Sequence, residues 1–240
     1  MEERKTIYLC LAHMSETGEE QKYVKEAFDT NWVVPLGPNV NGFEDDLKAF
    51  VSKNSDGSEL SREVVALSAG TAAVHLGLLA SGVGPGDEVC VQSFTFCASS
   101  HPITYLGATP VFIDSEPDSW NMDPELLEKA IIDRKEKTGK YPKAIVPVAL
   151  YGMPYDCDKI MAISEKYGIP VVEDAAEGCG SRWKGQVLGT FGKFGVLSFN
   201  GNKMITTSGG GALICQDAES KNNVMWYATQ ARDAYPYYQH

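Results

Sequence analysis

The chain has 240 residues, of which 43% are hydrophobic and 22% are charged, and its formal net charge is −11. This length can bury one sizeable core, so we expect a single domain, or one domain and the beginning of another. Nucleic acids and anionic membranes bind clustered lysine and arginine, and the acidic composition argues against both kinds of partner.

Targeting and metal signals are missing from the sequence. The first residues, MEERKTIYLC, lack the apolar core of a secretory signal, and the longest apolar run, 64–83, is interrupted by Ser, Gly, Thr and His. The six cysteines form no CxxC pair and no zinc-like spacing with histidine. We therefore expect a cytoplasmic protein with reduced thiols, no metal site and no membrane span.

Residues 17–28 predict an amphipathic helix near the start of the chain. Thr17 and Glu20 have the spacing of a capping box. One face carries the apolar side chains Tyr23, Val24, Ala27 and Phe28.

Strand and helix patterns then alternate along the chain. Asp123 before Pro124 predicts a helix start, and Gly168 predicts a helix end. The predicted strands are the apolar runs in 63–70, 86–94, 109–115, 143–152, 169–178 and 194–203, and the predicted helices are 71–81, 124–137 and 157–168. This order predicts an α/β fold with a mostly parallel, helix-covered sheet.

The first candidate site is SAGT, residues 68–71, where a predicted strand meets a helix. Gly70 permits close approach, and the helix start offers free N–H groups and a positive dipole end to a phosphate. Thr71 can add a hydroxyl donor. The alternative is an ordinary strand-to-helix turn capped by Thr71, and the spacing is not the GxGxxG of dinucleotide sites.

Two more candidates follow later strands, and ligands bind beyond the carboxyl ends of such strands. Asp174 ends the run VVED, and Glu177 follows three residues later; a solvated or capping Asp174 and a loop Glu177 are the alternatives. Lys203 lies in SFNGNKMITTSGGGAL without a P-loop motif, and a surface lysine is its alternative. A lysine amine can also form a Schiff base with a carbonyl cofactor. A phosphate site, a carboxylate for a pyridinium nitrogen and such a lysine are together what pyridoxal phosphate requires.

At these residues the chain resembles the DegT/DnrJ/EryC1/StrS family of pyridoxal-phosphate-dependent nucleotide-sugar aminotransferases. The resemblance covers nearly the whole chain and includes WVVPLGPNVNGFEDDLKAF, SAGTAAVHLGLLASGVGPGDEV, SFTFCASSHPITYLGATPVFID and SFNGNKMITTSGGGALI. It implies the large domain of fold-type I pyridoxal-phosphate-dependent transferases over residues 1–240, with an amino-terminal helical segment to about residue 55. It also implies that the small carboxyl-terminal domain of the family is absent from the chain.

The resemblance implies a role for each candidate around the cofactor. Lys203 matches the lysine that carries pyridoxal phosphate, and Asp174 matches the carboxylate at its pyridine nitrogen. Phe96 matches an aromatic side chain that stacks on the ring, with core packing as the alternative. Glu177 stands near the phenolic oxygen, where many relatives have Gln.

The phosphate cradle also follows from the resemblance. Its implied members are Thr71, the backbone of Ala72 and Ser198, close to Gly70.

The implied reaction moves an amino group from an amino acid, usually glutamate, to a nucleotide-linked keto sugar. The segment SFNGNKMITT around Lys203 is similar to that of family members acting on 4-keto-6-deoxy-hexoses. The resemblance also implies a homodimer whose sites use both subunits. Arg62, Arg182 and Arg232 are the candidates for the donor carboxylate.

Three alternatives to this reaction remain open. One is a pyridoxal-phosphate-binding relative without turnover. Another is a dehydratase of the same family, which would carry His at the position of Lys203. The third is a nicotinamide-linked oxidoreductase, for which the glycine fingerprint is lacking.

Overall fold

The computed structural model describes residues 14–237. The amino-terminal stretch 1–13 lies outside the described residues, and so do 238–240. The interpretation of MEERKTIYLC and the first part of the helical segment predicted to about residue 55 therefore fall outside them.

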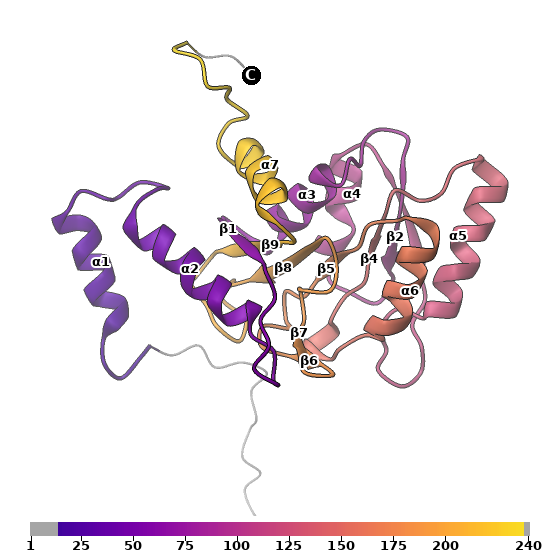
Figure 1. Ribbon diagram of the computed structural model, residues 1–240, viewed down its shortest axis with the longest axis horizontal. Helices are drawn as coiled ribbons and strands as arrows, with labels where there is room; N and C mark the ends of the chain where they lie inside the picture. The colour runs from indigo at the N-terminus through magenta and orange to yellow at the C-terminus, as the bar shows by residue number, and fades with distance from the viewer. Residues whose placement is uncertain (1–13, 238–240) are drawn as a thin grey trace, which may run out of the picture.

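Seven strands form the central layer, as a four-stranded and a three-stranded sheet that meet edge to edge (Figure 1). Parallel bridges, Ile145 to Val171 and Val148 to Asp174, join the two sheets. The strand order is β1 (Glu63–Leu67), β9 (Gly211–Cys215), β8 (Phe194–Ser198), β5 (Val172–Asp174), then β4 (Ala144–Val146), β2 (Glu88–Gln92) and β3 (Thr109–Ile113). Only β9 runs antiparallel to its neighbours in this layer. The predicted mostly parallel α/β fold is confirmed, whereas β9 is a strand that the sequence patterns do not predict.

Helices cover both faces of this layer, because successive side chains of a strand point to opposite faces. Val64 and Leu197 belong to one apolar core, and their neighbours Val65 and Val196 belong to the other. The first core is closed by α2 (Pro38–Ser52), α5 (Pro124–Thr138) and α6 (Cys157–Tyr167). The second is closed by α3 (Gly70–Ala80), α4 (His101–Tyr105) and α7 (Ala218–Ala228).

Short elements complete the described chain at the edges of the main layer. A small antiparallel pair is formed by β6 (Arg182–Trp183) and β7 (Gln186–Val187). Two single-turn helices, η1 (Cys97–Ser99) and η2 (Leu150–Gly152), follow β2 and β4.

The predicted helix ends at Asp123 and Gly168 are confirmed. The Asp123 carboxylate accepts hydrogen bonds from the N–H groups of Glu125 and Leu126 at the start of α5. Gly168 ends α6 in the left-handed conformation, with a φ of 67°. Both ends satisfy backbone groups that the helix leaves unpaired.

The start of α1 (Glu19–Asp29) differs from the predicted capping box. Gly18 is the N-cap residue and has a left-handed φ of 71°, so Thr17 lies outside the helix start. Ser15 binds Glu20 in place of Thr17: the Ser15 N–H and hydroxyl donate to the Glu20 carboxylate at 2.8 and 2.6 Å. The capping-box prediction is wrong because the chain turns at Gly18.

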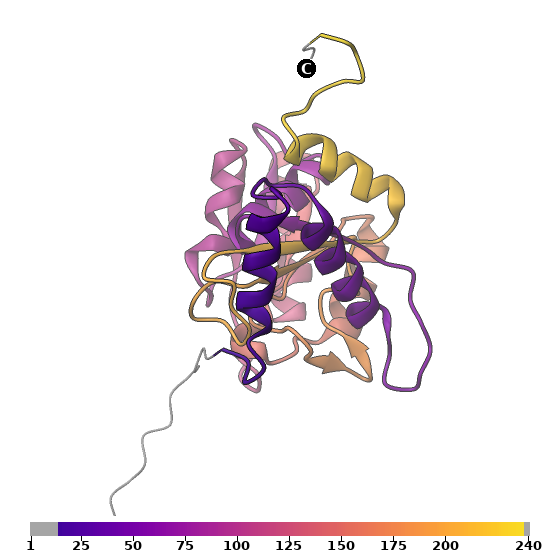
Figure 2. The ribbon, with the colours of Figure 1, turned by 90° about the vertical axis from the view of Figure 1, so that its left-hand side faces the viewer.

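The apolar face predicted for α1 is present but is left largely exposed by the described chain. Tyr23, Val24 and Phe28 are 53%, 58% and 66% exposed, and α1 contains no buried residue. Figures 1 and 2 show α1 standing beside α2, away from the sheet. Amphipathic patterning therefore gives α1 an apolar face of which more than half stays exposed at Tyr23, Val24 and Phe28.

A buried carboxylate in β5 anchors the loop before β8. Glu173 accepts the N–H groups of Gly189 at 2.9 Å and of Phe191 and Gly192 at 2.6 Å. Burial raises the pKa of Glu173, and these N–H donors lower it. The carboxylate thus holds an otherwise irregular loop against the sheet.

No helix within residues 14–237 is long and apolar enough to cross a membrane. No group of three potential His, Cys, Asp or Glu metal ligands occurs there either.

Candidate active site

A hollow of about 600 Å³ opens where β1, β2, β5 and β8 end and α3 begins. Its volume lies within the range of small-molecule sites. Seven of the predicted site residues line it: Gly70, Thr71, Phe96, Asp174, Glu177, Ser198 and Lys203. Segments far apart in the sequence therefore meet at one edge of the sheet, as predicted for such strands.

The start of α3 forms one wall of the hollow. Its N-cap residue, Ala69, is extended and supplies no side-chain cap, so the first-turn N–H groups, that of Ala72 included, lack intrahelical acceptors. The first intrahelical bond runs from the Ala73 N–H to the Ala69 carbonyl. Thr71 and Ser198 add hydroxyl groups to the same wall. Free N–H groups, hydroxyls and the positive end of the helix dipole can hold an anion.

Two glycines let this wall approach the sheet. A Cβ on Gly211 would lie 2.3 Å from the carbonyl carbon of Ala69, and a Cβ on Gly70 would lie 2.9 Å from the Cβ of Ser198. No flexible side chain could relieve the first contact, because its neighbours are backbone atoms. The site therefore depends on glycine at Gly211 to bring β9 against the start of α3.

Asp174 forms the floor of the hollow and is 6% exposed, so it is not a solvated side chain. The Ser99 hydroxyl donates to its Oδ2 at 2.6 Å, and the Ala176 N–H donates to its Oδ1 at 3.2 Å. Burial raises the pKa of Asp174; the two hydrogen bonds and the positive charge of Lys203 lower it, and Glu177 raises it. Burial is the largest of these causes and the pKa of Asp174 is raised overall, so a cationic ligand group beside it would favour its charged form.

Lys203 faces Glu177 across the hollow. Their Nζ and Oε1 atoms are 3.3 Å apart, and the two side chains are 14% and 31% exposed, which rules out the surface-lysine alternative. The other Glu177 oxygen accepts the Tyr151 N–H at 2.7 Å. Both partners of Glu177 are donors, so its carboxylate serves as an acceptor on both sides.

Three aromatic residues, Phe94, Phe96 and Tyr151, line the hollow. Phe96 is 74% exposed, which excludes core packing as its role. Tyr151 is 68% exposed and has a φ of 50°, a conformation that is uncommon outside glycine.

Tyr151 and Ser99 were not among the residues predicted for the site. Ser99 belongs to the hydroxyl-rich segment SFTFCASS after β2, and this position was its only sequence signal. The chain carries no comparable signal for Tyr151, whose placement follows from the hydrogen bond to Glu177.

The arginines predicted to bind a donor carboxylate lie elsewhere. Arg62 donates to the Thr190 carbonyl at 2.6 Å, and Arg182 donates to the Gly185 carbonyl at 2.9 Å. None of Arg62, Arg182 and Arg232 lines the hollow. The guanidinium groups of Arg62 and Arg182 instead fasten loops of the described chain.

Comparison with known proteins gives a family match over most of the chain. The model of the DegT/DnrJ/EryC1/StrS aminotransferase family matches residues 14–240. The crystal structure of a DegT DnrJ EryC1 StrS aminotransferase from Brucella abortus superposes with a TM-score of 0.80 at 32% identity, covering 95% of this chain and 62% of that chain.

Two curated relatives are similar in sequence. EpsN of Bacillus subtilis (strain 168), named as a pyridoxal phosphate-dependent aminotransferase, is 49% identical over 236 residues, which are 98% of this chain and 58% of EpsN. GDP-perosamine synthase of Caulobacter vibrioides is 40% identical over 200 residues, which are 83% of this chain and 50% of the synthase. The chain thus spans half to three fifths of the length of these relatives.

We expect Gly211→Ala to lower the free energy of unfolding by about 1–3 kcal/mol, the usual range for overpacking. The added methyl must displace backbone at the start of α3, because a Cβ there lies 2.3 Å from Ala69. Urea unfolding followed by circular dichroism measures the change. Gly209→Ala is the matched control, since a Cβ on Gly209 meets nothing within 4 Å. Equal midpoints for the two variants would contradict the expected contact.

Proposed function

Because the chain belongs to the DegT/DnrJ/EryC1/StrS aminotransferase family, we propose that it binds pyridoxal phosphate and moves an amino group from an amino acid to a nucleotide-linked keto sugar. The expected donor is glutamate, and the expected acceptor is a 4-keto-6-deoxy-hexose. The names of EpsN and GDP-perosamine synthase support the cofactor and the nucleotide-sugar class. The similarity of SFNGNKMITT to members that act on 4-keto sugars supports the finer substrate.

One observation carries this proposal: the uncapped start of α3, the buried Asp174 and Lys203 all line a single hollow. The residues present fit the cofactor, since uncapped N–H groups suit a phosphate and the buried carboxylate suits a protonated ring nitrogen. Lysine at 203 also disfavours the dehydratase alternative, which calls for His there.

When bound, pyridoxal phosphate supplies an electron sink for the carbon that exchanges its amino group. The chain's own part begins with orientation. Thr71, Ser198 and the N–H groups of α3 would hold the phosphate, and Asp174 would keep the ring nitrogen protonated. Phe96 would cover one face of the ring and exclude water from it.

Proton transfer is the proposed task of Lys203 once its amine is free. Its Nζ lies 3.3 Å from Glu177, whose carboxylate can position the amine and balance its charge. An amine held in this way can accept a proton at one reacting carbon and return it at another. The same base would serve both halves of the reaction.

The organisation of the protein is part of the proposal. We assign residues 1–240 to the large cofactor-binding domain, with helices in the amino-terminal segment. In support, α1 and α2 both end before residue 55, and the sheet with its hollow follows them.

We also propose a cytoplasmic location. The five described cysteines are all unpaired, as expected in a reducing compartment.

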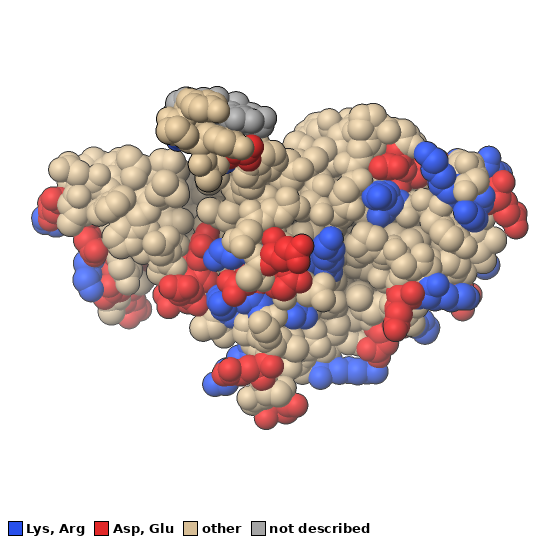
Figure 3. All heavy atoms as spheres, turned by 45° about the horizontal axis from the view of Figure 1, so that its top comes forward, with Lys and Arg blue, Asp and Glu red and all other residues tan. Residues whose placement is uncertain are grey.

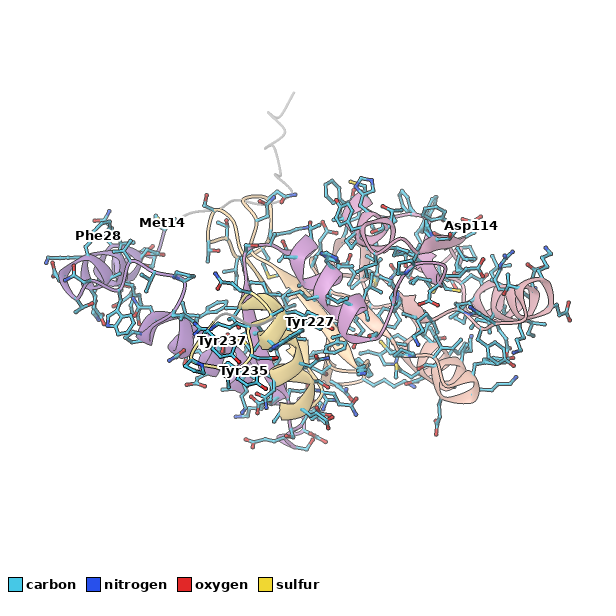
Figure 4. The ribbon with its side chains drawn as sticks, turned by 90° about the horizontal axis from the view of Figure 1, so that it is seen from above. Met14, Phe28, Asp114, Tyr227, Tyr235 and Tyr237 are labelled. Carbon is cyan, nitrogen blue, oxygen red and sulfur yellow. The ribbon has the colours of Figure 1, made fainter. Side chains whose placement is uncertain are left out.

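A homodimer is the proposed assembly, and exposed apolar side chains support it. Seven of them lie between residues 23 and 36: Tyr23, Val24, Phe28, Trp32, Val33, Val34 and Leu36. Figure 3 shows a broad uncharged area at the α1 end, with charged groups along its lower rim, and Figure 4 places Phe28 at that end. A second copy of the chain would bury this surface, which we call the α1 surface.

The first test of the function is covalent labelling. We expect borohydride reduction of the protein mixed with pyridoxal phosphate to leave a pyridoxyl group on Lys203, identified by peptide mass mapping. Lys203 is the lysine that lines the hollow, whereas Lys184 pairs with Asp158 and Lys193 lies over the Phe194 ring. Labelling at Lys184 or Lys193 instead would overturn the assignment.

The second test concerns the substrate. We expect the full chain, given glutamate and a panel of nucleotide-linked keto sugars, to form 2-oxoglutarate with 4-keto-6-deoxy-hexoses. Turnover of 3-keto sugars alone would remove the C4 assignment and keep the family reaction. Turnover of free keto acids alone would remove the sugar altogether, and cofactor labelling without turnover of any acceptor would favour the non-catalytic alternative.

The third test concerns assembly. We expect sedimentation velocity at micromolar concentration to show a dimer, twice the 26.1 kDa of the chain. Val24→Glu should shift the protein towards monomer, because it places a charge on the α1 surface. Ile132→Glu is the control: Ile132 is also a half-exposed β-branched residue, but it lies on α5. A monomeric parent protein, or equal effects of the two substitutions, would contradict the proposed interface.

A further inference from the structure

We propose that Thr95 and Ser99 form a hydroxyl relay that positions the Asp174 carboxylate and stabilises its negative charge in the active site. The inference rests on the proposed function, because it explains how Asp174 could serve the cofactor. The Ser99 hydroxyl lies 2.6 Å from Asp174 Oδ2, and the Thr95 and Ser99 hydroxyl oxygens are 2.9 Å apart. Both residues would be positioning residues, acting through Asp174.

The direction of the relay follows from counting hydrogens. A serine hydroxyl has one hydrogen to donate and can also accept. Ser99 donates that hydrogen to Asp174, so in its contact with Thr95 it must be the acceptor. Thr95 therefore donates to Ser99, and each hydroxyl strengthens the next hydrogen bond towards the negative charge.

The local fold explains why the relay is rigid. Ser99 is 1% exposed and ends the single turn η1, where its N–H donates to the Phe96 carbonyl at 3.1 Å. Thr95 lies two residues before the same turn and lines the hollow. The segment that presents Phe96 to the hollow thus also fixes Asp174 through Ser99.

The Ser99 hydrogen bond also affects the pKa of Asp174. Among the causes that lower the pKa of Asp174, the Ser99 hydrogen bond is the largest, ahead of the Ala176 N–H and the charge of Lys203. Burial and the charge of Glu177 act in the opposite direction. Within residues 14–237, Ser99 is the only side chain that donates a hydrogen bond to Asp174.

The decisive measurement is made without cofactor. Carboxyl carbon NMR of the apoprotein, assigned with Asp174→Asn, follows the titration of Asp174. A hydrogen bond to a charged group corresponds to about one to two pKa units, so we expect Ser99→Ala to raise the pKa of Asp174 by about that amount. Ser100→Ala is the matched control, because the Ser100 hydroxyl donates to the Cys97 carbonyl in the same segment and not to Asp174.

The contact between the Thr95 and Ser99 hydroxyls is tested by substitutions of Thr95. Thr95→Val should shift the pKa of Asp174 in the same direction by a smaller amount, and Thr95→Ser should restore the parent value because the hydroxyl is retained. Thr95→Val also carries the test if Ser99→Ala does not fold. An unchanged pKa in a folded Ser99→Ala protein, or in a folded Thr95→Val protein where Ser99→Ala fails, would overturn the relay.

Kinetics with cofactor provide an independent readout. We expect Ser99→Ala to lower kcat about tenfold and to change the KM for the amino donor less than about twofold. In an Asp174→Asn background the same substitution should have almost no further effect on kcat, since the two residues act as one unit. Losses that multiply independently in the double variant would contradict the relay.

The outcomes separate this inference from the proposed function. A pKa shift in the apoprotein without cofactor labelling at Lys203 would support the relay and reject the function. Cofactor labelling at Lys203 without the pKa shift would support the function and reject the relay.

Discussion

The structure depends on two consecutive buried carboxylates at the end of β5. Side chains alternate along a strand, so Glu173 and Asp174 point to opposite faces of the sheet. Glu173 holds the loop before β8 through three backbone N–H groups, while Asp174 forms the floor of the hollow. A buried carboxylate is stable only where it accepts hydrogen bonds, so each face of the sheet must supply donors beside β5.

The hollow joins groups of opposite charge at short range. The start of α3 offers unpaired N–H groups, Asp174 and Glu177 bring negative charge, and Lys203 brings positive charge. These groups come from three separate segments of the chain: the start of α3, residues 174–177 and the stretch after β8. The close contact at Gly211 makes this meeting possible, because any larger residue would separate β9 from the start of α3.

Outside the hollow, the amino-terminal segment exposes apolar side chains. The α1 surface carries large apolar side chains that the described chain leaves about half exposed or more. Exposed apolar surface of this kind is typical of protein–protein contact sites. Burial of this surface by a second copy would link cofactor binding and assembly in one protein, since α2 connects it to β1.

Local chemistry in the sequence determined the helix ends at Asp123 and Gly168, because caps depend on neighbouring residues. Local patterns also placed Asp174 at the end of a strand and Lys203 beyond one. Family resemblance supplied their expected roles. Tertiary structure alone decided the antiparallel β9, the partners of Glu177 and the Ser99 hydrogen bond, which spans 75 positions. These contacts join segments that are far apart in the sequence. Local patterns cannot predict them, because they arise from the packing of the whole sheet.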